Sequence, residues 1–94
     1  MAGIALSSAA HIAVLVDQQG RPTRNAILWN DQRSQDEADA LQAASGDEIF
    51  ARTCNRISTT WTLPHLVWIR RHDAEAWGRT RRILLSKDYV AYRL

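Results

Sequence analysis

A chain of 94 residues is long enough for one domain, which would bury roughly 60 to 65% of the surface that its unfolded form exposes. With 46% hydrophobic and 23% charged residues and no low-complexity tract, the composition is globular and excludes a disordered protein. The net charge of +2 comes from eleven arginines and one lysine spread over the whole length, which argues against a dedicated nucleic-acid-binding face.

The single cysteine, Cys54, allows neither an internal disulfide nor a thiolate metal cluster, so a reducing, cytoplasmic setting fits. The apolar segment 4–16 lacks a basic leader and contains His11, which excludes an export signal. No stretch approaches the roughly 20 apolar residues of a membrane span, so no membrane partner is expected.

Two short runs near the N-terminus have strand character. Gly3–Ser7 and Ile12–Val16 are both apolar, and small residues and His11 separate them. We therefore predict two strands with a functional break at His11. Because the first run begins almost at residue 1 and the last predicted helix has no C-cap, we expect the chain to be a piece of a longer protein.

The segment Asp17–Pro22 predicts a turn, because Gly20 can adopt the left-handed conformation that a bulged hairpin requires. The partner strand is then predicted at Ala26–Trp29. This hairpin would place His11 and the polar residues that follow the second strand in one sheet.

The polar run Asn30–Arg33 follows the second predicted strand directly. A strand end fixes the backbone, so the side chains just beyond it can be directed at a ligand. The indole of Trp29 adds a flat apolar surface beside these hydrogen-bonding groups. The stretch Asn25–Ser34 therefore predicts a binding site.

Helix signals dominate the rest of the chain. Ser34 begins a capping box, Gly46 separates two helices, and Asp73 caps a later one. The predicted elements, in chain order, are a helix over about 35–44, a short helix to about Thr53, a helix from Thr62 with Pro64 in its first turn, a turn or two from Asp73 to Trp77 ended by Gly78, a buried strand over Arg82–Leu85, and a helix capped by Ser86.

In this order, the motifs resemble the first domain of the FGGY carbohydrate kinases, most closely the xylulokinase-like branch. The matching stretches are Gly3–Pro22 with its His11, Asn25–Ser34, Thr62–His72, which is similar to the first family signature, and Leu85–Leu94. Two departures stand out. Ala9–Ala10 replaces the Gln-Met that precedes the histidine in that branch, and His65 replaces the lysine of the signature.

The resemblance implies an α/β fold: a partial ribonuclease H-like (actin-like ATPase) domain with strands and a β-hairpin followed by several helices. It implies an ATP-dependent carbohydrate kinase that phosphorylates a hydroxyl of a pentulose or a related sugar or polyol. Xylulose is the substrate that the resemblance favours most. ATP and Mg²⁺ would serve the full-length enzyme through parts upstream of residue 1 and downstream of residue 94, with none bound by residues 1–94. No catalytic residue is expected here, and a homodimer of the full-length protein stays open.

Five side chains are candidate sugar contacts, each with a structural alternative. By the resemblance, His11 contacts the sugar; the alternative is a histidine satisfied by backbone at a strand end. Trp29 either covers an apolar sugar face or packs in the core, and Trp61 either walls the pocket or packs. Asp31 either accepts from sugar hydroxyls or caps the following turn. Arg33 either donates to the substrate or pairs with a nearby aspartate.

Two functions from different classes follow. The leading hypothesis is a segment of a sugar kinase that supplies part of the sugar site and is inactive alone. The alternative is a non-enzymatic sugar-binding or regulatory remnant of the kinase fold, which the altered Ala9–Ala10 pair favours.

Overall fold

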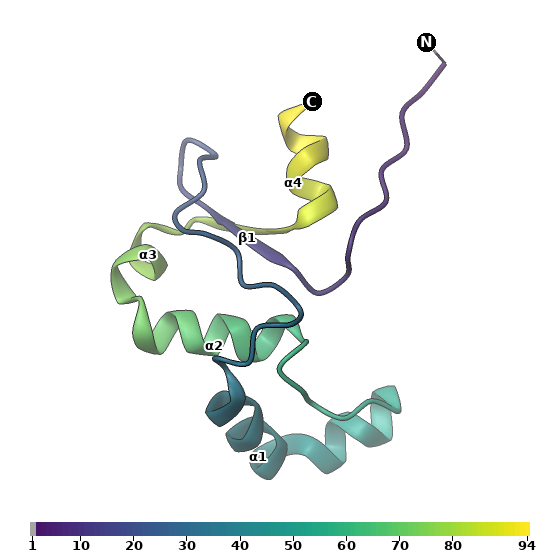
Figure 1. Cartoon of the computed structure of the whole chain (residues 1–94), viewed down its shortest axis with the longest axis vertical. Coiled ribbons are helices and arrows are strands. Elements are labelled where there is room, and N and C mark those ends of the chain that lie inside the picture. The colour runs from purple at the N-terminus through teal and green to yellow at the C-terminus, as the bar shows by residue number, and fades with distance from the viewer. Residues whose placement is uncertain (1) are drawn as a thin grey trace.

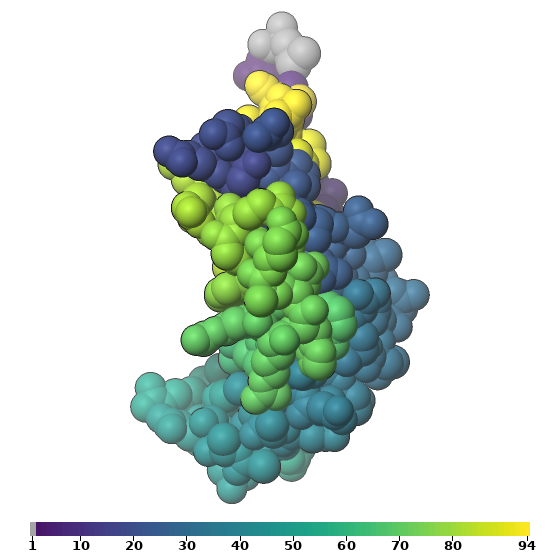
Figure 2. Space-filling view, turned by 90° about the vertical axis from the view of Figure 1, so that its left-hand side faces the viewer, coloured from purple at the N-terminus to yellow at the C-terminus, as the bar shows by residue number. Residues whose placement is uncertain are grey.

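The computed structural model describes residues 2–94, which contain four helices and a two-stranded antiparallel sheet (Figure 1). In chain order the elements are β1 (Ala13–Val16), α1 (Gln35–Thr53), α2 (Thr62–His72), α3 (Ala74–Arg79), β2 (Arg82–Leu85) and α4 (Ser86–Arg93). Figure 2 shows α4 and the turn after β1 at one end, α2 and α3 in the middle, and α1 at the other end. The architecture is mixed α/β, as predicted.

The sheet pairs two strands that are far apart in the sequence. β1 lies antiparallel to β2, with Ala13 opposite Leu85 and Val16 opposite Arg82. Both strands were predicted at these positions, and both are confirmed. The prediction that β2 is buried is wrong: three of its four residues are exposed within residues 2–94.

The predicted hairpin partner Ala26–Trp29 is not a strand, and this prediction is wrong. The edge of β1 that faces this segment makes an isolated bridge to Pro22. Beside it, the Leu15 carbonyl accepts bonds from the Thr23 N–H at 2.9 Å and from the Thr23 hydroxyl at 3.4 Å. Proline has no N–H to extend the ladder, and the chain leaves the strand after Thr23. Of the predicted strand, Ile27 alone is buried in the core.

The predicted turn after β1 is confirmed. The Gly20 N–H donates to the Asp17 carbonyl at 3.0 Å, and Gly20 has a φ of 78°. The Asp17 carboxylate accepts bonds from the backbone N–H groups of Gln19 and Arg21, both at 2.9 Å. These bonds fix the loop without help from a neighbouring strand.

The predicted strand Gly3–Ser7 is absent. The segment has no strand partner among residues 2–94, and Ile4 and Leu6 are 63% and 39% exposed. Figure 1 shows this segment running away from the rest of the chain. Strand propensity needs a neighbouring strand to become a β-ladder, and the described residues provide none here.

One continuous helix, α1, replaces the two predicted helices, so the break at Gly46 is wrong. Gly46 is buried under the side chain of Gln42, whose amide oxygen accepts a bond from the Ile57 N–H at 3.2 Å. The glycine therefore makes room for this cross-link and does not end the helix. Ser34 precedes α1 but makes no capping bond, and its buried hydroxyl has no partner among residues 2–94.

Of the caps predicted for α3 and α4, only the one at Asp73 forms. Asp73 caps α3 by accepting a bond from the Ala76 N–H at 3.2 Å, as predicted. The helix continues past Gly78 to Arg79. Ser86 begins α4 without a side-chain cap, and its hydroxyl instead lies 2.9 Å from that of Ser8.

The core lies where β1 faces α2 and the chain after the turn. It consists of four buried residues and three partly buried ones: Ala13, Leu15, Ile27 and Ile69, with Leu66, Trp68 and Trp77 packed against them. Ala13 and Leu15 are two positions apart in β1, so both side chains leave the same face of the strand and pack in this core. No helix in residues 2–94 combines the length and the hydropathy that crossing a bilayer would require.

Candidate functional site

A cavity of about 350 Å³ lies where three segments meet: the turn before β1, the end of α1 and the start of α2. Its lining residues are His11, Thr53, Asn55, Trp61, Thr62 and Leu63. The lining combines an imidazole, an amide and two hydroxyl groups with an indole and a leucine. Cavities of this size and mixed lining are typical of small-molecule sites.

His11 and Trp61 form the aromatic pair of this cavity. Their ring centroids are 6.5 Å apart and their planes differ by 14°. His11 is exposed and has a φ of 63°, a left-handed backbone conformation that is uncommon for a residue with a side chain. Backbone strain of this kind concentrates at functional sites, and here it occurs at one of the predicted site residues.

The position of Trp61 is set by a short hydrogen-bonded loop. The Trp61 N–H donates to the Ser58 carbonyl at 3.2 Å as α2 begins. Between them, Thr59 is buried, and its hydroxyl donates to the Gln32 side-chain oxygen at 2.9 Å. The loop is therefore tied to the segment that precedes α1.

Buried His65 forms a hydrogen bond to this loop. Its Nε2 lies 2.5 Å from the Thr59 carbonyl, so the Nε2–H donates, while Nδ1 is buried without a partner among residues 2–94. Burial lowers the pKa of His65, and the hydrogen bond to Thr59 and the charge of Asp31 oppose this only in part. His65 is thus a neutral imidazole that holds the loop carrying Trp61.

The buried neutral state of His65 predicts a loss of stability in mild acid. Below the ordinary histidine pKa of about 6.5, His65 is protonated in the unfolded chain. In the native chain it stays neutral until the pH reaches its lower pKa. The free energy of unfolding therefore falls as the pH drops through this window. In His65→Gln, which can still donate to Thr59, this part of the decrease should be absent. Urea denaturation at roughly pH 7.5 and pH 5.5 measures it; equal decreases in both proteins would contradict the assignment.

Asp31 and Arg33 form an ion pair outside the cavity. Arg33 Nη2 lies 2.8 Å from Asp31 Oδ2, and the Arg33 backbone N–H also donates to the same carboxylate at 2.9 Å. The side-chain bond from Arg33, followed by the backbone bond, lowers the pKa of Asp31. The Arg33 guanidinium also lies 5.0 Å from the centre of the Trp68 ring. The structural alternative for Arg33, pairing with Asp31, is therefore present.

The structure brings together only two of the five predicted site residues. His11 and Trp61 line the cavity, whereas Trp29, Asp31 and Arg33 do not. Trp29 lies in a turn and is 60% exposed. The hairpin that would have joined these residues to His11 in one sheet does not form. The charges of Asp31, Arg33 and His11 each influence the pKa of buried His65. Their contact with a ligand stays a prediction.

Sequence reasoning missed four lining residues: Thr53, Asn55, Thr62 and Leu63. Thr53 is the last residue of α1, Asn55 follows in the connection, and Thr62 and Leu63 begin α2. The sequence did contain a signal for these residues: a short polar loop between two predicted helices, next to the candidate residue Trp61, is a common place for a binding site.

Comparisons with known proteins give a consistent result. The model for the N-terminal domain of the FGGY family of carbohydrate kinases matches residues 1–94. The chain is 39% identical over 92 residues to the xylulose kinase of Bacillus subtilis, covering 98% of this chain and 18% of that protein. It is 36% identical over 95 residues to the xylulose kinase of Staphylococcus xylosus, covering 100% and 20%.

Solved structures agree. The crystal structure of a xyloylose kinase from Brucella ovis has a TM-score of 0.78 and 42% identity, covering 86% of this chain and 17% of that one. The xylulose kinase from Bifidobacterium adolescentis has a TM-score of 0.79 and 25% identity, covering 88% and 20%. The chain thus spans about a fifth of the length of the curated relatives it matches.

Proposed function

Since the chain belongs to the FGGY family of carbohydrate kinases, as part of the N-terminal domain, we propose that it supplies one wall of the sugar site in a xylulose kinase. The activity belongs to the whole protein: transfer of a phosphoryl group from ATP to a hydroxyl of the sugar. The resemblance predicted from the sequence to the xylulokinase-like branch is confirmed by these relatives.

The observation that carries the proposal is the pairing of His11 with Trp61 across the 350 Å³ cavity. A sugar presents C–H faces and hydroxyl groups in alternation. The indole offers a flat apolar surface to the former, and the imidazole and the Asn55 amide offer donors and acceptors to the latter. Each such bond contributes about 1 kcal/mol net, so a few of them orient a small polyol.

Residues 1–94 supply the sugar side of the reaction only. Among residues 2–94 there is no group of three or more histidine, cysteine or carboxylate side chains that could hold a metal ion. In this proposal the metal and ATP are held by other parts of the protein. Phosphoryl transfer requires both a positioned acceptor and those cationic groups, so the isolated chain should be inactive.

Further parts of the domain would also cover apolar side chains that are exposed here. Ile4 and Leu6 in the N-terminal segment and Val90 and Leu94 in and after α4 are 39 to 74% exposed. Figure 1 shows that these two segments extend from the same end of the molecule. Contiguous apolar surface on a soluble domain usually marks an interface. We propose that the remaining polypeptide of the kinase domain packs there.

The roles of Trp29, Asp31 and Arg33 remain part of the proposal. None lines the cavity, yet the charges of Asp31 and Arg33 act on His65, which holds the Trp61 loop. We propose that this ion pair fixes the segment that holds the Trp61 loop, because Gln32, which lies between the two residues, accepts a hydrogen bond from the Thr59 hydroxyl at 2.9 Å. Trp29, exposed on the turn before them, is available to a ligand from outside.

His11→Gly should separate binding from stability. Glycine adopts positive φ freely, so removal of the strain of about 1 kcal/mol outweighs its extra entropy cost, and the free energy of unfolding should rise by about 0.5 kcal/mol. Loss of the imidazole should weaken sugar binding about fivefold, equivalent to about 1 kcal/mol. Chemical denaturation of the chain and calorimetric titration of the chimera described below measure the two effects.

Cys54→Gly is the matched control. Cys54 is the other non-glycine residue with a positive φ among residues 2–94, at 57°, and it lines no part of the cavity. Its replacement should raise stability similarly and leave sugar affinity unchanged. If His11→Gly binds sugar as tightly as this control, His11 is not a sugar contact.

The experiment that tests the proposal is an exchange. The matched 92-residue segment of the Bacillus subtilis xylulose kinase is replaced by residues 1–94, and the chimera is titrated with D-xylulose by calorimetry. We expect binding of D-xylulose with an affinity close to that of the parent enzyme. A folded chimera that binds no xylulose would contradict the proposal, and one that binds without ATP turnover would favour a sugar-binding remnant.

A further inference from the structure

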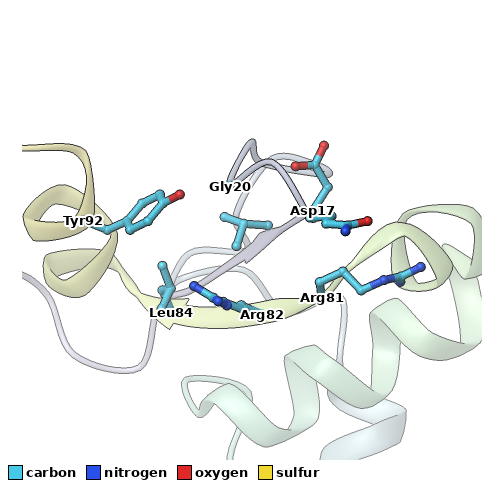
Figure 3. A pocket seen from close by; sticks show the side chains of 8 residues that line it. Asp17, Gly20, Arg81, Arg82, Leu84 and Tyr92 are labelled. Atoms are coloured by element: carbon cyan, nitrogen blue, oxygen red, sulfur yellow. The ribbon is translucent and has the colours of Figure 1, made fainter.

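A second cavity, of about 500 Å³, lies at the other end of β1 and shares no residue with the first. His11 precedes β1, whereas the second cavity begins at Val16 and Asp17, where the strand ends. The turn after β1, strand β2 and helix α4 enclose it (Figure 3). The volume is within the range of small-molecule sites.

The lining of this second cavity combines charged and polar side chains with the aromatic ring of Tyr92 and two aliphatic side chains. Arg82 and Leu84 are two positions apart in β2, so their side chains rise from the same face of the strand (Figure 3). The ring of Tyr92 reaches over from α4 toward Gly20, and it lies so close that a Cβ at Gly20 would collide with the Tyr92 hydroxyl. The glycine thus lets the turn and α4 approach each other over the cavity.

The charges around this cavity are unbalanced. The Arg82 side chain makes no hydrogen bond or ion pair with any residue in 2–94, although it projects into the cavity wall. Arg81 donates only to the carbonyl groups of Gly78 and Thr80, at 2.8 and 3.1 Å. The one carboxylate in the lining, Asp17, is already paired with Arg21 at 3.4 Å. Among residues 2–94, the Arg82 guanidinium therefore faces the cavity without a paired anion, whereas the Arg81 guanidinium points away from Leu84 and Tyr92 (Figure 3).

We propose that this second cavity binds a small organic phosphate, with its anionic group on Arg82 and its apolar body against Tyr92 and Leu84. A guanidinium presents paired N–H donors that match the oxygens of a phosphate, and the Tyr92 hydroxyl adds a further donor. Coulomb attraction grows with the charge of the ligand, so a phosphate dianion is favoured over a carboxylate. The site is independent of the sugar cavity.

The test uses the 94-residue chain and phenyl phosphate as the probe, with binding followed by ¹H–¹⁵N NMR shifts. We expect millimolar binding, with the largest shifts in the turn after β1, in β2 and in α4. Benzoate should bind more weakly, inorganic phosphate more weakly because it lacks the apolar body, and phenol not detectably. Affinity should fall as salt is raised, since the ion pair is accessible to solvent.

Arg82→Gln should weaken phenyl phosphate binding about tenfold, as expected for loss of a charge-assisted pair. Arg70→Gln is the matched control, because Arg70 is also exposed, lies on α2 and lines neither cavity. Both substitutions are at exposed positions and should leave the circular dichroism spectrum unchanged. Equal losses in the two variants, equal binding of phenol, or no shift with phenyl phosphate would overturn the proposal.

Discussion

Replacing Leu15 with alanine is expected to lower the free energy of unfolding by about 3 kcal/mol, the typical cost of removing a buried leucine side chain. Leu15 is 2% exposed in the middle of β1 and belongs to the core cluster with Ile27 and Ile69. The substitution removes apolar burial and leaves a cavity that a two-stranded sheet cannot close. Because a domain of this size has only a few kcal/mol of stability, a large fraction of the variant should be unfolded.

Urea denaturation followed by circular dichroism measures this effect, and Leu28→Ala is the control. Leu28 is 50% exposed, and an exposed leucine should cost no more than about 0.5 kcal/mol. The comparison also tests the corrected fold. If Ala26–Trp29 were a strand of the sheet and the Leu28 side chain were buried in the core, Leu28→Ala and Leu15→Ala would be similarly destabilised.

Replacing Trp61 with alanine should weaken D-xylulose binding by the chimera roughly tenfold, or about 1.5 kcal/mol. Trp61 lines the cavity and stacks beside His11 with ring centroids 6.5 Å apart. Its loss removes the apolar surface for the C–H face of the sugar and the neighbour that orients the imidazole.

The control for Trp61→Ala is Phe50→Ala, also an aromatic residue but one that is 42% exposed on α1 and outside the cavity. Calorimetric titration should show xylulose affinity within a factor of about two of the unmodified chimera for this variant. If Trp61→Ala binds equally well, the indole is only packing, which is the structural alternative that the sequence left open.

Local patterns predicted the elements that depend on local physics. The strands at Ala13–Val16 and Arg82–Leu85, the turn at Gly20 and the Asp73 cap all follow from propensity and capping chemistry within a few residues. The helix that begins at Thr62 was predicted for the same reason.

Two of the predicted strands do not form. Gly3–Ser7 and Ala26–Trp29 have strand composition, but the pairing of β1 with β2 joins residues about 70 positions apart, such as Ala13 and Leu85. No segment among residues 2–94 pairs with Gly3–Ser7, and on the other edge of β1 the regular pairing ends after Thr23, so strand composition alone was insufficient at both places. The break predicted at Gly46 was wrong because the glycine serves the packing of Gln42 and not a helix end.

The candidate site was predicted in part for the same physical reason. His11 and Trp61 were identified separately, through resemblance to the family, and the fold brings them together at one cavity. Asp31 and Arg33 were placed beside His11 through a hairpin that does not form, and they instead pair with each other at 2.8 Å. The buried role of His65 required knowledge of its environment, because a lysine-to-histidine replacement does not reveal burial.

The central claim, that residues 1–94 form the sugar wall of a xylulose kinase, is tested most directly by the turnover of the chimera. The measurement is the D-xylulose-dependent release of ADP by three proteins: the chimera, the parent Bacillus subtilis enzyme and the isolated 94-residue chain. We predict turnover by the chimera within about tenfold of the parent, a change of up to about 1.4 kcal/mol in the barrier, and none by the isolated chain. A folded chimera that releases no ADP with xylulose, or xylulose-dependent ADP release by the isolated chain, would contradict this account.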